Sequence, residues 1–99
     1  MIPKSVLIVD DSIAIRQAIT NSLKKAGFSV YEACNGEDAL DIARKNNYDL
    51  VLTDVNMPVM DGLTLIRHLR KLPSYKNTPI LALTAENLTE LKAKGRSAV

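Results

Sequence analysis

The chain has 99 residues, which is enough for one small domain with a core of its own. A hydrophobic fraction of 46% argues against a disordered chain, and a formal net charge of +2 gives no general attraction to nucleic acid or membranes. The single cysteine excludes an internal disulfide, and no signal peptide or membrane-spanning run is evident. We therefore expect one cytoplasmic domain over residues 1–99, with no nucleic-acid or membrane partner.

Strands and helices are predicted to alternate along the chain. Strands are expected at residues 4–9, 28–33, 50–53 and 80–83, and helices at residues 12–27, 35–47, 61–70 and 86–98. Asp11 or Ser12 can cap the start of the first helix, Asn35 can cap the second, and Gly27 suits the end of the first. Short connections between alternating strands and helices indicate right-handed βαβ units and a parallel sheet.

Apolar residues at helical spacing predict which side of each helix faces the core. The inward positions are Ile15, Ala18, Ile19, Ser22, Leu23 and Ala26 in the first helix, Ala39, Leu40 and Ala43 in the second, and Leu65, Ile66 and Leu69 in the third. The basic residues clustered over 67–76 are interpreted as the solvated side of a helix.

Three of the four predicted strands end on polar side chains. Asp10 and Asp11 follow the first strand, Asp54 follows the third and Thr84 follows the fourth. If the strand order is 2-1-3-4, the three carboxylates meet at one edge of the sheet, where each pair at about 5 Å repels by about 3 kcal/mol. A Mg²⁺ ion would offset that repulsion. The alternatives left open are a helix-capping role for Asp11 and an exposed loop carboxylate at Asp54.

The sequences "LIVDDS", "VLTDVNMPVMDG" and "ILALTA" resemble the receiver domain of two-component response regulators, the CheY-like family. The resemblance runs from Lys4 to about Ala98, and Thr84 follows Asp54 by 30 positions, a spacing similar to that of the family. It implies a doubly wound, flavodoxin-like α/β fold with strand order 2-1-3-4. It also implies signalling by transfer of a phosphoryl group from a sensor histidine kinase or phosphotransfer protein, with a downstream protein as target.

The resemblance assigns a role to each residue that matches the family motifs. Asp54 is implied to be the phosphoacceptor, and Thr84 the hydroxyl that responds to phosphorylation. Asp11 and Asp54 would bind Mg²⁺ through their carboxylates, and the backbone carbonyl of Asn56 would be a third ligand. Asp10 would act on the metal through a bound water.

Three residues of the loop after the third strand are given structural roles. Gly62 is expected to permit a close approach of the backbone at the start of the third helix. Met57 and Met60 are expected to pack the loop rather than to take part in chemistry.

The chain departs from the family pattern at its end. A receiver normally continues with a fifth strand, which ends in an active-site lysine, and a fifth helix, whereas this sequence stops at Val99. We therefore expect a sheet that lacks the fifth βα unit, weaker phosphorylation or switching, and an exposed edge that favours a homo-oligomer or domain swapping.

Two other functions remain as alternatives. The first is a truncated or engineered receiver-derived scaffold that lacks full signalling activity. The second is a Mg²⁺-dependent phosphatase of the haloacid-dehalogenase type, which needs an Asp-x-Asp pair after the first strand where this chain has Asp10-Asp11. No multiple-turnover enzyme is expected, although the resemblance implies that a receiver assists its own phosphorylation.

Overall fold

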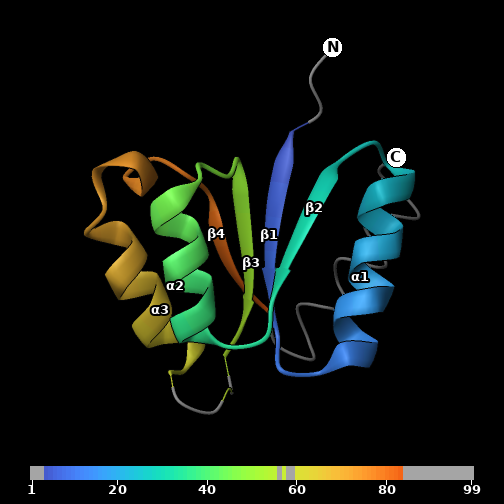
Figure 1. Ribbon diagram of the computed structural model, residues 1–99, viewed down its shortest axis with the longest axis horizontal. Helices are drawn as coiled ribbons and strands as arrows, with labels where there is room; N and C mark the ends of the chain where they lie inside the picture. The colour runs from blue at the N-terminus through green and yellow to red at the C-terminus, as the bar shows by residue number, and fades with distance from the viewer. Residues whose placement is uncertain (1–3, 56, 58–59, 84–99) are drawn as a thin grey trace.

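The computed structural model describes residues 4–55, 57 and 60–83, which form a parallel sheet of strand order β2-β1-β3-β4 with helices on both faces (Figure 1). The strands are β1 (Ser5–Val9), β2 (Ser29–Ala33), β3 (Leu50–Asp54) and β4 (Ile80–Leu83). The helices are α1 (Ile13–Lys25), α2 (Gly36–Lys45) and α3 (Gly62–Arg70), with a short 3₁₀ turn η1 (Pro73–Tyr75). The predicted fold and strand order are confirmed, and the described residues include no fifth βα unit. The helix predicted over 86–98 lies outside them.

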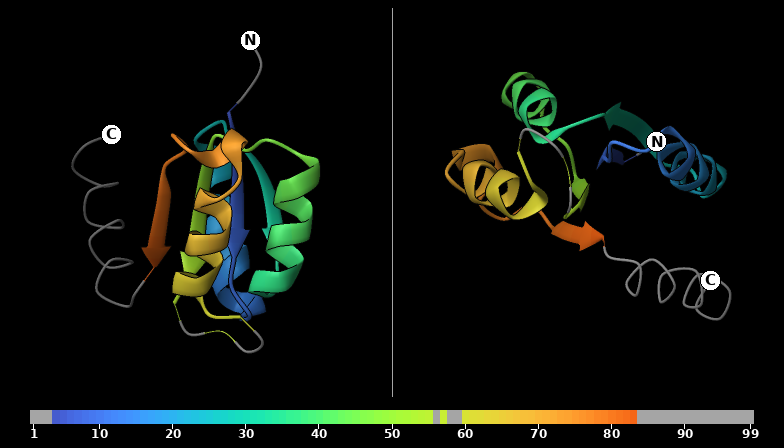
Figure 2. Two further views of the ribbon diagram at one scale, coloured as in Figure 1. Left: turned by 90° about the vertical axis from the view of Figure 1, so that its left-hand side faces the viewer. Right: turned by 90° about the horizontal axis from the view of Figure 1, so that it is seen from below.

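The sheet lies between two unequal layers. Helices α2 and α3 cover one face and α1 covers the other (Figure 2). Successive residues of β1 alternate between these faces, so Leu7 and Val9 join the core beneath α2 and α3, whereas Val6 and Ile8 join the core beneath α1. All four side chains are fully buried, which explains why this strand is a continuous apolar run.

Polar side chains cap the helices where the sequence places them. Ser12 accepts a hydrogen bond from the Ile15 N–H, and Asn35 accepts one from Asp38 at 2.8 Å. The C-terminal end of α1 is followed by Gly27 at a φ of 96°, a conformation that glycine adopts without strain. Ser12 is therefore the cap of α1, and the alternative that gave this role to Asp11 is wrong.

The inward face predicted for α1 is wrong in part. Only Ile19 and Leu23 of the six predicted positions are half-buried, whereas Ile15, Ala18, Ser22 and Ala26 are exposed. In the part of the chain that the structure describes, α1 is the one helix on its face of the sheet, and it packs along β1 and β2. A single helix buries a narrow strip, and this strip includes Thr20.

The connection between α3 and β4 contains a core residue that the sequence pattern missed. Tyr75 in η1 is fully buried, and its hydroxyl donates a hydrogen bond to the Asn46 carbonyl at the end of α2. The Arg70 guanidinium donates to the carbonyls of Tyr75 and Thr78 at 2.8 and 2.7 Å. The basic residues over 67–76 are exposed, apart from the half-buried His68. Because α3 ends at Arg70, Lys71 and Lys76 lie beyond the helix on which the prediction placed them.

The loop between β3 and α3 passes very close to the end of β3. A Cβ atom added at Gly62 would lie 2.0 Å from the carbonyl oxygen of Asp54, and the Gly62 N–H donates to the Val55 carbonyl at 2.9 Å. The predicted close approach at Gly62 is therefore confirmed. Met57 is buried and Met60 packs against the core, which confirms their packing role.

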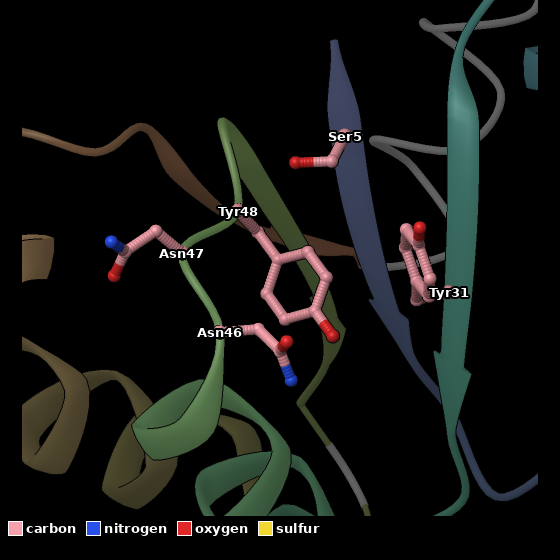
Figure 3. A pocket seen from close by; sticks show the side chains of 5 residues that line it. All are labelled: Ser5, Tyr31, Asn46, Asn47 and Tyr48. Atoms are coloured by element: carbon pink, nitrogen blue, oxygen red, sulfur yellow. The ribbon is translucent and has the colours of Figure 1, made fainter. Parts of the chain in front are cut away.

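A shallow hollow of about 280 Å³ lies at the opposite end of the sheet (Figure 3). Its lining residues are Ser5, Tyr31, Asn46, Asn47 and Tyr48. The rings of Tyr31 and Tyr48 are 5.3 Å apart and tilted, so they stabilise this end of the sheet by packing. No helix in the described part of the chain is long and apolar enough to cross a membrane.

Replacing Thr20 with valine is expected to stabilise the protein by about 1 kcal/mol. Among the described residues, the Thr20 hydroxyl is the one buried side-chain group without a hydrogen-bond partner, and valine has nearly the same shape without that group. Urea unfolding followed by circular dichroism measures the change. Thr20→Ser, which keeps the hydroxyl and removes the methyl group, is the control and should lower stability; a valine variant no more stable than the wild type would contradict the prediction.

Gly62→Ala is expected to lower the free energy of unfolding by about 3 kcal/mol, because the new Cβ meets a backbone oxygen that cannot move aside. Helix propensity alone predicts the opposite sign, a gain of about 1 kcal/mol. In Gly27→Ala the new Cβ meets nothing within 4 Å. The free energy of unfolding should therefore fall by less than in Gly62→Ala, and only because alanine is strained at a positive φ. Stabilisation by Gly62→Ala in urea unfolding would show that the close approach is not a constraint.

Candidate metal centre at the carboxyl end of the sheet

Three aspartates converge where β1 and β3 end. The parallel register sets Val9 beside Thr53, so the next residues lie side by side: Asp10 follows β1 and Asp54 is the last residue of β3. One carboxylate oxygen from each of Asp10, Asp11 and Asp54 lies within 4.8 Å of the others. The expected convergence of the three acids at one edge is therefore confirmed.

Asp10 is the buried member of the cluster, with 3% of its surface exposed. Its backbone N–H donates to the Ala33 carbonyl at 3.2 Å, and its carboxylate accepts a hydrogen bond from the Ser12 N–H at 2.8 Å. Burial raises the pKa of the Asp10 carboxyl, and the neighbouring Asp54 and Asp11 carboxylates raise it further, while the Ser12 hydrogen bond acts in the opposite direction. The charged form of Asp10 is thus disfavoured when no cation is present.

Asp54 and Asp11 are more accessible than Asp10. Asp11 is exposed and Asp54 is half-buried at the last position of β3. One oxygen of the Asp54 carboxylate accepts a hydrogen bond from the Val55 N–H at 2.8 Å, and the Thr53 hydroxyl donates to the Asp54 carbonyl at 3.0 Å. These contacts hold Asp54 at the mouth of the cluster while leaving it accessible to solvent.

Two of the predicted site residues are not placed by the structure. Asn56 and Thr84 both lie outside the described residues. The pairing of β3 with β4 is described as far as Asp54 opposite Leu83.

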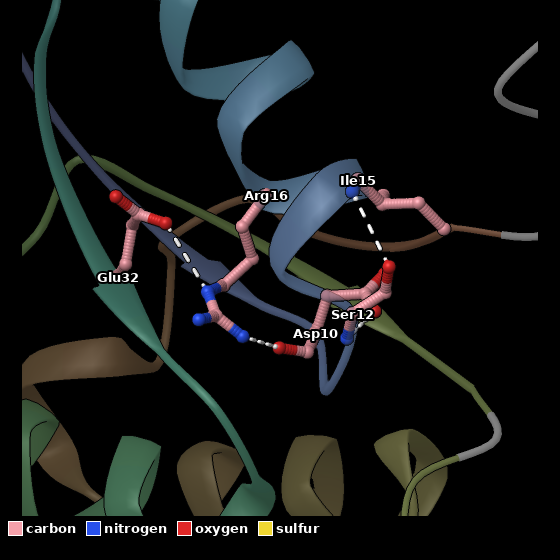
Figure 4. Close-up of polar contacts among 5 residues, drawn as sticks. All are labelled: Asp10, Ser12, Ile15, Arg16 and Glu32. Carbon is pink, nitrogen blue, oxygen red and sulfur yellow. Dashed lines mark hydrogen bonds and ion pairs between the residues drawn. The ribbon is translucent and has the colours of Figure 1, made fainter.

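The sequence interpretation missed a basic side chain beneath the cluster. Arg16 donates from Nη1 to the Asp10 carbonyl at 2.6 Å and from Nε to the Glu32 carboxylate at 3.1 Å (Figure 4). An arginine one turn into a helix is usually solvated, and a bond to a backbone carbonyl has no sequence signature. The one available signal was its position four residues after the Ser12 cap, which places it over the end of β1.

The donor set suits a small, hard divalent cation. Carboxylate oxygens are the ligands that Mg²⁺ prefers in proteins, and it commonly uses one or two of them together with water. The proximity of three acids gathers negative charge at one point, and burial, which raises the pKa of Asp10, adds to the cost of charging that carboxyl. The residues present therefore fit a magnesium site.

Curated relatives match most of this chain. It is 38% identical over 90 residues to the transcriptional regulatory protein SrrA of Staphylococcus aureus. The matched segment covers 91% of this chain and 36% of that protein. This chain is 36% identical over 89 residues to a probable transcriptional regulator, ycf29, of Pyropia yezoensis. That match covers 90% of this chain and 40% of that protein. The chain thus spans well under half the length of these relatives.

Solved structures and a family comparison agree with this relationship. The chemotaxis response regulator CheY4 of Vibrio cholerae superposes with a TM-score of 0.83 at 44% identity, covering 97% of this chain and 80% of that one. The receiver domain of a sensor histidine kinase from Pseudomonas aeruginosa PAO1, which has a magnesium ion coordinated in its active-site cleft, gives 0.82 at 31% identity, covering 88% of this chain and 71% of that one. The response regulator receiver domain model matches residues 6–98. This chain therefore belongs to the response regulator receiver domain family.

Proposed function

We propose that this chain is a phosphoacceptor receiver of two-component signal transduction, which takes a phosphoryl group onto Asp54. The observation that carries the proposal is the convergence of Asp10, Asp11 and Asp54 at the carboxyl end of the sheet. The family assignment supports it, since receiver domains are signalling modules. The donor would be a phosphohistidine on a sensor histidine kinase or a phosphotransfer protein.

In the proposed reaction, a carboxylate oxygen of Asp54 attacks the phosphorus atom of the phosphohistidine. An O–P bond forms and the P–N bond breaks, the electron pair returns to the imidazole, and the product is an aspartyl phosphate. The half-buried position of Asp54 leaves its carboxylate open to a donor, and the Val55 N–H holds one of its oxygens. Phosphoryl transfer needs mainly positioning and charge neutralisation.

Magnesium is the proposed cofactor. Asp11 and Asp54 would bind it through their carboxylates, the Asn56 backbone carbonyl would be a third ligand, and Asp10 would act through a water. When bound, Mg²⁺ neutralises charge on the oxygens of the transferring phosphoryl group. The structure of a relative's receiver domain with magnesium in its cleft supports this assignment.

The change in protein contacts that would follow phosphorylation stays a prediction. Phosphorylation adds charge and acceptor oxygens at Asp54, and Thr84 is proposed to donate a hydrogen bond to one of them and so to change the surface offered to a downstream protein. A cytoplasmic location, the absence of multiple turnover and the association of copies also stay predictions. The 46% exposure of Leu81 on β4, the outer strand of the sheet in the described part of the chain, supports the last of these.

The scaffold alternative is not favoured. A scaffold would need the sheet and its cores but not three acids that repel one another at one end, so the retained cluster favours signalling. The phosphatase alternative is also not favoured, because the chain belongs to the receiver family and has adjacent acids after β1.

Incubation with Mg²⁺ and acetyl phosphate is expected to add one phosphoryl group to the wild-type chain, as measured by intact-protein mass spectrometry. Asp54→Asn should show no adduct, because an amide cannot form the acyl phosphate. Asp41→Asn removes an exposed acid from α2 and should leave the adduct unchanged. A wild-type chain without an adduct at saturating donor, or an adduct that survives Asp54→Asn, would refute the proposed function.

Asp10→Asn is expected to raise the free energy of unfolding at pH 7 by about 1–3 kcal/mol in EDTA. The folded state raises the pKa of Asp10, so protonation of this group favours folding below its unfolded pKa, and this contribution is lost as the pH rises through the folded pKa. The advantage of the variant should therefore be largest at neutral pH and shrink as the pH falls toward 4.

Urea unfolding of both proteins at several pH values measures this difference, and Asp41→Asn controls for the loss of one negative charge at an exposed position. Asparagine keeps a side-chain oxygen that can accept the Ser12 hydrogen bond, so the comparison isolates the charge. Saturating Mg²⁺ should reduce the difference, because only the wild type has all three charges to offer the ion. A variant less stable than the wild type at pH 7 in EDTA would contradict the prediction.

A further inference from the structure

Arg16 joins three elements beneath the acid cluster. Its helix, α1, begins directly after the turn that contains Asp10 and Asp11, and its guanidinium reaches back to the Asp10 carbonyl at 2.6 Å. On its other side it contacts the Glu32 carboxylate near the end of β2 at 3.1 Å (Figure 4). The Arg16 side chain is only 15% exposed, whereas that of Glu32 is 39% exposed.

The rigid shape of the guanidinium lets one partner of Arg16 set the direction of its contact with the other. A guanidinium is planar and carries its donors in a fixed fork, so a partner on one edge orients the donors on the other. Here the Glu32 carboxylate holds Nε, and Nη1 is thereby directed at the Asp10 carbonyl. Because Glu32 is accessible to solvent, the ion pair itself contributes little energy, and its effect is mainly on the orientation of Arg16.

The Asp10 carbonyl belongs to the peptide that joins the two adjacent acids. A peptide unit is planar, so fixing the direction of this carbonyl fixes the plane from which the Asp11 residue departs. The Asp10 N–H is already held by the Ala33 carbonyl, and its carboxylate by the Ser12 N–H. Among the described residues, Arg16 is the one that donates a hydrogen bond to the Asp10 carbonyl, at the junction between Asp10 and Asp11.

We propose that Arg16, oriented by Glu32, is a positioning residue that fixes the Asp10–Asp11 peptide and so directs these carboxylates toward Asp54 for metal binding. The inference rests on the proposed function, because it assigns the residue that prepares the same magnesium site. Arg16 itself touches a backbone carbonyl and acts on the metal through Asp10 and Asp11.

The sign of the change in Mg²⁺ affinity separates positioning from simple electrostatics. Removing a cation near three acids would, by charge alone, strengthen the binding of another cation. Loss of positioning would instead weaken Mg²⁺ binding, because the carboxylates would no longer be directed at one point. We expect Arg16→Met to weaken Mg²⁺ binding by roughly tenfold, as measured by calorimetric titration of the full chain. Unchanged or tighter binding in this variant would overturn the proposal.

Two conservative variants test the geometry. Arg16→Lys keeps the charge but lacks the planar fork, so Mg²⁺ binding should stay weaker than in the wild type. Glu32→Gln should weaken binding by about twofold in the wild-type background and should add nothing in the Arg16→Met background, since Glu32 acts through Arg16. Full rescue by lysine would show that the planar fork is not needed, and additive effects of the two substitutions would show that Glu32 does not act through Arg16. Either result would overturn the positioning role.

Lys25→Met is the matched control, because it removes one positive charge from the opposite end of α1 and should leave Mg²⁺ affinity unchanged. Urea unfolding identifies variants that are folded during the titration, and Arg16→Lys and Glu32→Gln carry the test if Arg16→Met does not fold.

A second readout needs no metal. The backbone amide signals of Asp11 and Ser12 should shift in Arg16→Met in EDTA and remain in place in Lys25→Met. A wild type that does not bind Mg²⁺ would refute the proposed function, whereas a wild type that binds while these amide signals and the affinity stay unchanged in Arg16→Met would overturn this inference alone.

Discussion

The parallel pairing of β1 with β3 is the constraint on which the rest of the structure depends. It sets Val9 beside Thr53 and therefore places Asp10 and Asp54 next to each other at the carboxyl end of the sheet. The burial of four apolar side chains in β1 supplies the free energy that holds these strands in register. The carboxylates are thus brought together against their own repulsion, and a site that attracts a cation is built into the sheet.

The sequence predicted those parts of the fold that depend on local signals. The caps at Ser12 and Asn35 are short-range hydrogen bonds between neighbours in the chain. Residue types alone therefore identified Asn35 and narrowed the cap of α1 to Asp11 or Ser12. The exposed side of α1 could not be identified, since periodicity marks the apolar positions but not how many of them a neighbouring element covers. Tyr75 was missed because its burial depends on contacts with a distant segment of the chain.

The candidate site was predictable to a similar degree. The three acids could be grouped because the carboxyl ends of parallel strands lie at one edge of the sheet. The burial of Asp10, and the rise in its pKa that follows, depend on the surrounding packing and could not be deduced from its position after a strand. The contact of Arg16 with a backbone carbonyl was unpredictable for the same reason: it is set by the three-dimensional path of the turn.

The buried tyrosine in η1 has a consequence for how the molecule moves. Its hydroxyl bond to Asn46 ties the connection between α3 and β4 to the connection between α2 and β3, and Arg70 closes the same turn. These two connections are therefore linked, so neither can move away from the sheet without breaking a contact with the other. This half of the molecule is expected to behave as one cooperative unit, against which the α1 side can fluctuate separately.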